Sequence, residues 1–270
     1  MGRIDDLWRY DGRRVVVTGC SSGIGASVVR QVRELGATVV GLDIAEPTED
    51  LDEFHRVDMS DAESIDRAVA AVGAGADGLF NVAGVSSGIG DPIRVVTINF
   101  LGLRRFTEAV LAGMPAGSTV ASVSSLAAAS YLEHRDQVDG LLDTDGMDSG
   151  IDWCRANPDA VADGGYRLSK EAIIYYTMRN AVALGARGIR INCTGPGVTE
   201  TPILDQLRSA YGRDYLDTIP KPLGRVSEPD EQAAVLVFLN SRAASYVTGQ
   251  VIWVDGGNVG ARIAGVTAGT

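Results

Sequence analysis

A short valine-rich run that leads into three closely spaced glycines is the feature that most limits the folds open to this chain. Residues 14–18 contain three consecutive β-branched valines, and residues 23–35 repeat apolar side chains at the period of a helix. Gly19, Gly23 and Gly25 lie at the junction, where a sharp backbone turn would let a pyrophosphate approach the helix N-terminus. The spacing G-x-x-x-G-x-G also fits an ordinary turn in a chain with 33 glycines, so its meaning depends on the rest of the sequence.

The alternation of short apolar runs and helical stretches continues to the end of the chain. Strands separated by helices form parallel pairs with right-handed crossovers. The sequence therefore predicts an α/β fold with a single doubly wound parallel sheet of the Rossmann type, helices on both faces and ligands at the carboxyl ends of the strands. Further strands are predicted near residues 37–43, 54–58, 78–82, 119–124, 190–194 and 250–254, and further helices near residues 61–72, 92–112, 166–186 and 229–240.

One domain over residues 1–270 is expected, because no linker rich in Pro, Ser or charge divides the chain. Residues 127–164 interrupt the alternation, since they contain no clear strand. Their nine acidic residues, against Arg135 and Arg155, supply seven of the eleven net negative charges. A segment this long before the helix at 166–186 indicates either a functional lid or an insert with short helices of its own, one of which Trp153 could anchor.

Charge and composition exclude several classes of partner. The formal net charge of −11 argues against nucleic acid and against an anionic membrane surface. No stretch approaches the ~20 apolar residues of a membrane span, and the charged N-terminus lacks the apolar region of a secretory signal. A cytoplasmic protein with a small-molecule partner is expected. Three widely spaced cysteines, and two histidines without neighbouring ligands, predict free thiols and no metal site.

Tyr166 and Lys170 indicate proton-transfer chemistry. Residues at i and i+4 share one face of a helix, so the Lys170 ammonium can approach the Tyr166 phenol and anything bound beside it. A fixed cation lowers the pKa of a nearby phenol, which would make Tyr166 a plausible acid or base near neutral pH. The spacing alone is common by chance and gains weight from the other motifs.

Asp43 predicts the choice of nucleotide. It ends the second predicted strand, 18 residues past Gly25, where a carboxylate accepts hydrogen bonds from the adenosine ribose. That carboxylate would repel a 2′-phosphate, and neither Ile44 nor Cys20 offers the cation of an NADP site. NAD is therefore predicted over NADP, although an ordinary strand-end acid would also fit.

Taken together, these segments resemble the short-chain dehydrogenase/reductase family across essentially the whole chain. Each motif is weak alone, but their joint order is specific. The fourth strand reads NVAG rather than the commoner NNAG, a change that this position should tolerate. The motifs are TGxxxGIG at residues 18–25, Asn81-Val82-Ala83-Gly84, Asn99, Ser124-Ser125, Tyr166-x-x-x-Lys170, and Pro196-Gly197 followed by Thr201.

The resemblance implies an NAD site and a set of catalytic roles. Tyr166 would exchange a proton with the substrate oxygen, and Ser125, rather than Ser124, would hold that oxygen. Lys170 would bind the nicotinamide ribose and lower the pKa of Tyr166, while Asn99 would hold a water that links Lys170 to solvent. The residues implied to bind the cofactor are Gly19, Ser21, Ser22, Gly23, Ile24, Gly25, Asp43, Asp58, Met59, Asn81, Ala83, Gly84, Tyr166, Lys170, Pro196, Gly197, Val198 and Thr201.

Within the family, the 41-residue separation between Ser125 and Tyr166 resembles the 3α-hydroxysteroid dehydrogenase/carbonyl reductase group and, almost equally, the coniferyl-alcohol dehydrogenase group. Residues 197–204 and 243–247 extend this likeness. Both groups imply NAD-dependent oxidation of a secondary or allylic alcohol on a bulky apolar substrate. The apolar residues of the segment after Thr201 would then either close over this ligand or simply pack a surface helix; they are Ile203, Leu204, Leu207 and Tyr211.

Three further interpretations concern assembly and activity. The helix that carries Tyr166 packs against a neighbouring subunit in many relatives, so a homodimer or homotetramer is implied. An NAD-binding sensor without chemistry is the alternative class, but Tyr166 and Lys170 are both present. A fatty-acyl ketone or a sugar is a further alternative substrate, and the acidic insert argues against docking a carrier-bound thioester.

Overall fold

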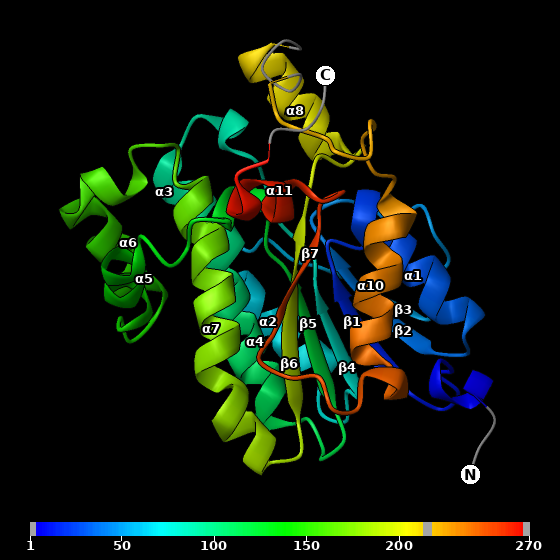
Figure 1. The fold of residues 1–270 in the computed structure, drawn as a ribbon. Coiled ribbons are helices and arrows are strands. Elements are labelled where there is room, and N and C mark those ends of the chain that lie inside the picture. The colour runs from blue at the N-terminus through cyan, green and yellow to red at the C-terminus, as the bar shows by residue number, and fades with distance from the viewer. Residues whose placement is uncertain (1–3, 213–217, 267–270) are drawn as a thin grey trace.

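A seven-stranded parallel sheet forms the centre of the computed structural model, which describes residues 4–212 and 218–266 (Figure 1). Its strand order is β3-β2-β1-β4-β5-β6-β7, with every neighbouring pair parallel. The predicted Rossmann-type architecture is confirmed. The strands are β1 (Arg14–Thr18), β2 (Thr38–Asp43), β3 (Glu53–Arg56), β4 (Gly78–Asn81), β5 (Thr119–Val123), β6 (Arg190–Pro196) and β7 (Val251–Val254).

Helices bury both faces of this sheet, as strand β1 illustrates. Val16 belongs to one apolar core, while Val15 and Val17 belong to a second core on the opposite face, because successive side chains of a strand alternate. A strand buried on both faces reads as a continuous apolar run. Helices α1 (Gly23–Glu34) and α10 (Pro229–Asn240) cover one face, and α2 (Ala62–Val72), α4 (Leu103–Ala112) and α7 (Tyr166–Ala186) cover the other (Figure 1).

The helix predicted over residues 92–112 is not uniform. It consists of α3 (Pro92–Val96), a π-helical segment (Thr97–Gly102) and α4. Gly102 lies so close to the Met59 carbonyl oxygen that a Cβ atom there would overlap it. The π-helical turn contains Asn99, so a local irregularity occurs at a predicted catalytic position, as such turns often do.

The acidic segment 127–164 is an insert with helices of its own. Helices α5 (Arg135–Leu142) and α6 (Met147–Ala156) lie outside α7 (Figure 1). Trp153 anchors this pair as predicted, because its indole packs against Gly140 so closely that no side chain fits there. Only Ala127 of the segment lines the cavity described below, so the alternative prediction of a lid is not supported.

Two further helices lie at the end of the molecule where the strands terminate. They are α8 (Pro202–Tyr211) and α11 (Asn258–Ala264) (Figure 1). Leu204, Ile203 and Leu207 are placed by α8 along a cavity wall. Across residues 4–212 and 218–266, no helix combines the length and apolar character required to cross a bilayer.

Candidate active site

A cavity of about 1160 Å³ opens at the carboxyl ends of the strands. It exceeds the ~300–1,000 Å³ usual for small-molecule sites, so it has room for a dinucleotide and a second ligand. Most of the predicted site residues line it, although they come from segments far apart in the sequence. These are Gly19, Ser22, Gly23, Ile24, Gly25, Asp43, Asp58, Met59, Ala83, Gly84, Ser125, Tyr166, Lys170, Pro196, Gly197, Val198 and Thr201.

The glycine turn is shaped to bring backbone close to a ligand. Gly19 and Gly23 adopt φ of +71° and +51°, a region that favours glycine. A Cβ atom on Gly19 would lie 2.7 Å from the Ala83 nitrogen, and one on Gly25 would overlap the Gly19 carbonyl oxygen. The Ser22 side chain makes no capping hydrogen bond to α1, so the first amides of this helix can serve an anion. The turn therefore fits a pyrophosphate.

Thr18 holds the glycine turn against the fourth strand. Its Oγ1 accepts hydrogen bonds from the backbone nitrogens of Val82 (3.1 Å) and Ala83 (3.2 Å). Thr18 itself is fully buried and does not line the cavity. The sequence motif contains this residue, but only the structure shows that it joins two parts of the nucleotide site.

Asp43 is fixed at the end of β2 by backbone amides. Its Oδ2 accepts a hydrogen bond from Ser21 N (3.0 Å), and its Oδ1 accepts one from Ala45 N (3.1 Å). Each oxygen keeps a further lone pair for a ligand, because an ionised carboxylate can accept about four hydrogen bonds. Asp43 is half-buried and lines the cavity, so a ribose hydroxyl can reach it.

Tyr166, Lys170 and Ser125 meet in the cavity wall. The Lys170 Nζ atom lies 5.7 Å from the centre of the Tyr166 ring and donates a hydrogen bond to Val123 O (3.0 Å). Ser125 lies near the Tyr166 phenol, whose pKa it lowers. The neighbouring Ser124 donates instead to the Lys170 carbonyl oxygen (2.7 Å). These contacts favour Ser125 over Ser124 as the serine that would hold a substrate oxygen.

Three predicted site residues lie behind the cavity wall. The Ser21 hydroxyl donates to Ala45 O (2.6 Å), and Asn81 Nδ2 donates to the Thr107 (2.9 Å) and Ser122 (3.2 Å) hydroxyls. Asn99 is fully buried in the π-helical turn. The structure therefore does not bring these three side chains to the wall, and it shows them supporting the segments that form it.

Burial shifts the pKa values of the central pair in opposite directions. It raises the pKa of the Tyr166 phenol, and the nearby Ser125 side chain opposes that rise. The predicted lowering of this pKa by Lys170 is not found. Burial also lowers the pKa of the Lys170 ammonium to about 8, so the group that would supply the positive charge is itself costly to ionise here.

Replacing Lys170 by Met should stabilise the protein in the absence of cofactor. The folded pKa is about 8 against 10.5 for the free group, so the unfolded state binds more protons between these values and wild-type stability rises with pH across this window. Below pH 8 the variant should gain on the order of 3 kcal/mol, or roughly 5 °C in Tm. Thermal unfolding at pH 7 and pH 10 tests this, and an equal gain at both values would contradict it.

Several wall residues carry no motif that would have revealed them. Ile219 and Pro220 line the cavity between α8 and α10, and Arg94 and Arg262 reach it from α3 and α11. Asn258 Nδ2 donates to Pro220 O (2.6 Å) and so joins α11 to this wall. Their positions depend on chain segments that meet only in the folded state.

The cysteines are free and buried, and the described residues contain no metal cluster. Burial raises the thiol pKa to about 12 for Cys20 and Cys193 and to about 11 for Cys154. Within residues 4–212 and 218–266, no group of three or more His, Cys, Asp or Glu residues is arranged to hold a metal ion.

A glycine turn between the first strand and helix, with a fixed carboxylate at the end of the next strand, defines a dinucleotide-binding protein of the Rossmann class. Comparison with known families agrees. The short chain dehydrogenase family matches residues 13–135, and the family described as Enoyl-(Acyl carrier protein) reductase matches residues 156–258.

Similar proteins extend this agreement over nearly the whole chain. Coniferyl-alcohol dehydrogenase of Pseudomonas sp. (strain HR199 / DSM 7063) is 37% identical over 91% of this chain and 96% of its own. The 3-alpha-hydroxysteroid dehydrogenase/carbonyl reductase of Comamonas testosteroni is 34% identical over 90% and 95%. The structure of 3-alpha-hydroxysteroid dehydrogenase from Pseudomonas sp. B-0831 complexed with NADH is 30% identical, with a TM-score of 0.80 over 94% of this chain and 99% of that chain.

The chain belongs to the short-chain dehydrogenase/reductase family and is an oxidoreductase. Proteins of this family bind a nicotinamide cofactor and act on small molecules. Two features fit such a cofactor. The glycine turn leaves space that added Cβ atoms would fill, and Asp43 places a fixed carboxylate beside the cavity.

Proposed function

We propose that this protein interconverts a secondary or allylic alcohol and a carbonyl on a bulky apolar substrate with NAD, as a 3α-hydroxysteroid dehydrogenase/carbonyl reductase does. Oxidation of an aromatic allylic alcohol such as coniferyl alcohol is the alternative. The observation that carries the proposal is the meeting of Tyr166, Ser125 and Lys170 beside the glycine turn in one cavity. A non-catalytic sensor would have no need of this arrangement.

In this mechanism, Tyr166 takes the proton of the substrate hydroxyl during oxidation and returns it during reduction. The hydroxyl of Ser125, which lies near the Tyr166 phenol, would hold the substrate oxygen within reach. A bound nicotinamide cofactor would supply the hydride acceptor for oxidation or the hydride donor for reduction. Lys170 would bind the nicotinamide ribose beside Tyr166.

Asn99 would complete the proton relay by accepting from a water. Both of its amide protons are already donated, to Val85 O (2.9 Å) and to Ser169 Oγ (3.3 Å), and its Oδ1 accepts from Val85 N (2.8 Å). The residue therefore keeps only acceptor capacity. Its Oδ1 and the Lys170 Nζ would lie 3.1 Å and 3.5 Å from a Cβ atom added to Gly84, so a water that contacts both would link Lys170 to Asn99.

Asp43 should make the protein prefer NAD over NADP by about 100-fold or more in Kd, because the carboxylate would lie against a 2′-phosphate. The Asp43→Asn variant keeps a hydrogen-bond acceptor but has no charge. It should lower the ratio of the Kd for NADP to the Kd for NAD about tenfold, mainly through tighter NADP binding. Titration of each nucleotide by fluorescence measures both constants.

The matched control is Asp58→Asn, because Asp58 also lines the cavity but would border the adenine. In this variant, the ratio of the Kd for NADP to the Kd for NAD should stay within about twofold of the wild-type ratio. An unchanged ratio in the Asp43 variant, or tighter NADP than NAD binding by wild type, would contradict the assignment.

An apolar wall favours a bulky ring-bearing substrate. Leu126, Ile203, Leu207 and Ile219 line the cavity on the side of Ser125 and α8. Helix α8 is held across this opening by hydrogen bonds from Tyr211 to Ser87 Oγ (3.0 Å) and from Ser86 to Gln206 (3.0 Å). These contacts support the interpretation that the segment after Thr201 closes over the ligand and excludes water.

Two exposed arginines in the cavity wall favour a substrate that also carries an anionic group. The guanidinium groups of Arg94 and Arg262 form no hydrogen bond or ion pair with any described residue. Most other arginines among the described residues form at least one such contact. In a chain with net charge −11, cations without partners beside a cavity are available to a carboxylate. Hydroxysteroids with and without a side-chain carboxylate are therefore the substrates to compare.

We further propose that the protein is cytoplasmic. We also propose a homodimer or homotetramer, because the start of α7 and the insert lie side by side at one edge of the molecule, and this helix packs against a neighbouring subunit in many relatives (Figure 1). The molar mass from light scattering tests this assembly. The function is tested by NADH formation with NAD against hydroxysteroids and aromatic allylic alcohols. NAD binding without turnover on either class would favour the sensor or an untried substrate.

A further inference from the structure

The first turns of α7 carry two pairs of side chains at i and i+4, offset by one residue. Tyr166 and Lys170 face the cavity. Arg167 and Glu171 lie one position further on, about 100° around the helix, and face the insert. The catalytic pair and this second pair are therefore held by the same two turns of backbone.

Glu171 is the buried centre of an ion cluster that joins α7 to the insert. Its side chain is 0% exposed. Its Oε1 lies 2.8 Å from His134 Nδ1, and its Oε2 accepts a hydrogen bond from Arg167 Nη1 (2.7 Å). Arg167 also donates to Asp163 Oδ2 (2.6 Å) and to Gln137 Oε1 (3.3 Å). His134, Gln137 and Asp163 all belong to the insert, whereas Arg167 and Glu171 belong to α7. The cluster therefore connects the insert to this helix.

The first turn of α7 begins without a side-chain cap. Gly164 and Gly165 precede Tyr166 with φ of +91° and +73°, and Gly165 offers no side chain to cap the helix. Terminal helical turns without caps fray readily. A buried carboxylate, by contrast, strongly favours the one geometry in which both of its oxygens are bonded.

We propose that the cluster of His134, Asp163, Arg167 and Glu171 positions Tyr166 and Lys170 for catalysis, so that the insert is a positioning element of the active site. His134 is the contact that tests this most cleanly, because it lies in the insert, is 30% exposed and does not line the cavity. The proposal rests on the proposed function for its kinetic effect, but its structural effect can be measured without turnover.

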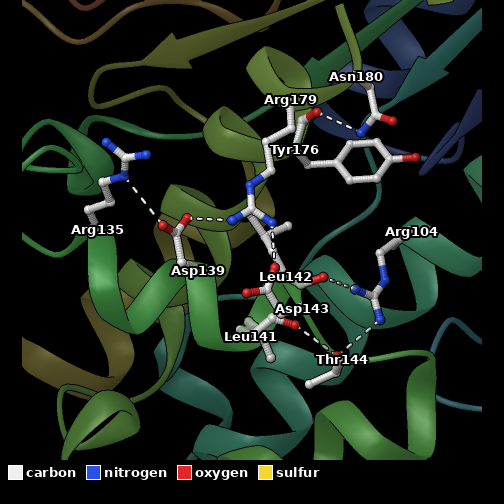
Figure 2. A network of polar contacts seen from close by, with 10 residues as sticks. All are labelled: Arg104, Arg135, Asp139, Leu141, Leu142, Asp143, Thr144, Tyr176, Arg179 and Asn180. Carbon is white, nitrogen blue, oxygen red and sulfur yellow. Dashed lines mark hydrogen bonds and ion pairs between the residues drawn. The ribbon is translucent and has the colours of Figure 1, made fainter. Parts of the chain in front are cut away.

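A second set of contacts between the insert and α7 provides a matched control. Figure 2 shows Arg179 reaching Asp143 (2.7 Å) and Asp139 (2.8 Å) on and after α5. Arg179 lies more than three helical turns beyond Tyr166. It therefore fastens the same insert to the same helix without acting on the first turns.

The experiment compares His134→Ala, His134→Gln and Arg179→Ala. His134→Ala should lower kcat about tenfold or more, because small misplacement of reacting groups is costly, while the KM for the alcohol and the Kd for NAD change less than about twofold. His134→Gln, which keeps an N–H donor for Glu171, should recover most of the rate. Arg179→Ala should keep kcat within about twofold of wild type.

Hydrogen exchange provides the readout that is independent of activity. Amides of residues 164–172 should lose protection in His134→Ala and keep it in Arg179→Ala. Equal losses of kcat in both Ala variants, or unchanged exchange in His134→Ala, would overturn the proposal. If wild type turns over no alcohol, while exchange responds as expected, the proposed function fails and the positioning of the helix start stands.

Discussion

Replacing Tyr166 by Phe should lower kcat by two to four orders of magnitude, because the variant keeps the ring but loses the group that would exchange the substrate proton. The phenol lies in the cavity wall near Ser125, and the Lys170 ammonium lies over the face of its ring. The Kd for NAD should change little, since the glycine turn and Asp43 remain intact. Steady-state turnover and fluorescence titration of NAD on the same preparation measure the two quantities.

The adjacent serines supply the matched control for this prediction. Ser125→Ala removes the hydroxyl near the Tyr166 phenol that would hold the substrate oxygen, and it should lower kcat about 100-fold. Ser124→Ala removes only the hydrogen bond to the Lys170 carbonyl oxygen, so its effect should be mainly on stability. Loss of turnover in Ser124→Ala alone, or substantial turnover in Tyr166→Phe, would show that the catalytic assignment is wrong.

Replacing Gly25 by Ala should weaken NAD binding by about 100-fold or more and lower Tm. A methyl group at this position would overlap the Gly19 carbonyl oxygen, which is backbone and cannot rotate away. The turn would have to open, and the amides at the start of α1 would then be displaced from the pyrophosphate. Calorimetric titration with NAD and thermal unfolding measure both effects.

Gly185→Ala is the control for this substitution. Gly185 is exposed in α7, and no atom lies within 4 Å of the Cβ that an alanine would add. Alanine in a helix is favoured over glycine by up to about 1 kcal/mol, so this variant should be slightly more stable and bind NAD normally. Tight NAD binding by Gly25→Ala would contradict the placement of the pyrophosphate.

The sequence predicts the sheet well because its strands are buried on both faces. The run Val15-Val16-Val17 can satisfy two apolar cores only as a strand between two layers of helices. The third strand is predicted less well: the sequence predicts it at residues 54–58, and the structure has it at Glu53–Arg56. This strand lies at the edge of the sheet, and its residues are partly exposed. Edge strands carry a weaker apolar signal.

The insert is less predictable for a physical reason. Its two helices bury few apolar residues, among them Val138 and Leu141, and many of its other residues are acidic. The contacts that order it are distant in sequence, such as Trp153 against Gly140 and Arg104 donating to Leu142 O (3.3 Å) and Thr144 Oγ1 (3.2 Å) (Figure 2). The spacing of apolar residues along the chain does not indicate such contacts.

Motifs predict which segments build the site but not the direction of each side chain. Asn81 and Ser21 belong to the correct segments, yet their side chains bond to the interior of the fold. The Tyr166 pKa illustrates the same limit, because spacing indicates a nearby cation while burial decides the direction of the shift. Arg94 and Arg262 have no motif at all and become wall residues only through tertiary structure.

The buried cysteines make this protein convenient for site-specific labelling. With thiol pKa values of about 11 to 12, the native side chains hold about one part in a thousand or less of thiolate at pH 8 and are shielded from reagents. A single cysteine introduced on the exposed side of α8 would therefore react with a maleimide dye in the native background. Such a reporter would test whether this helix moves during ligand binding, and the three natural cysteines could remain in place.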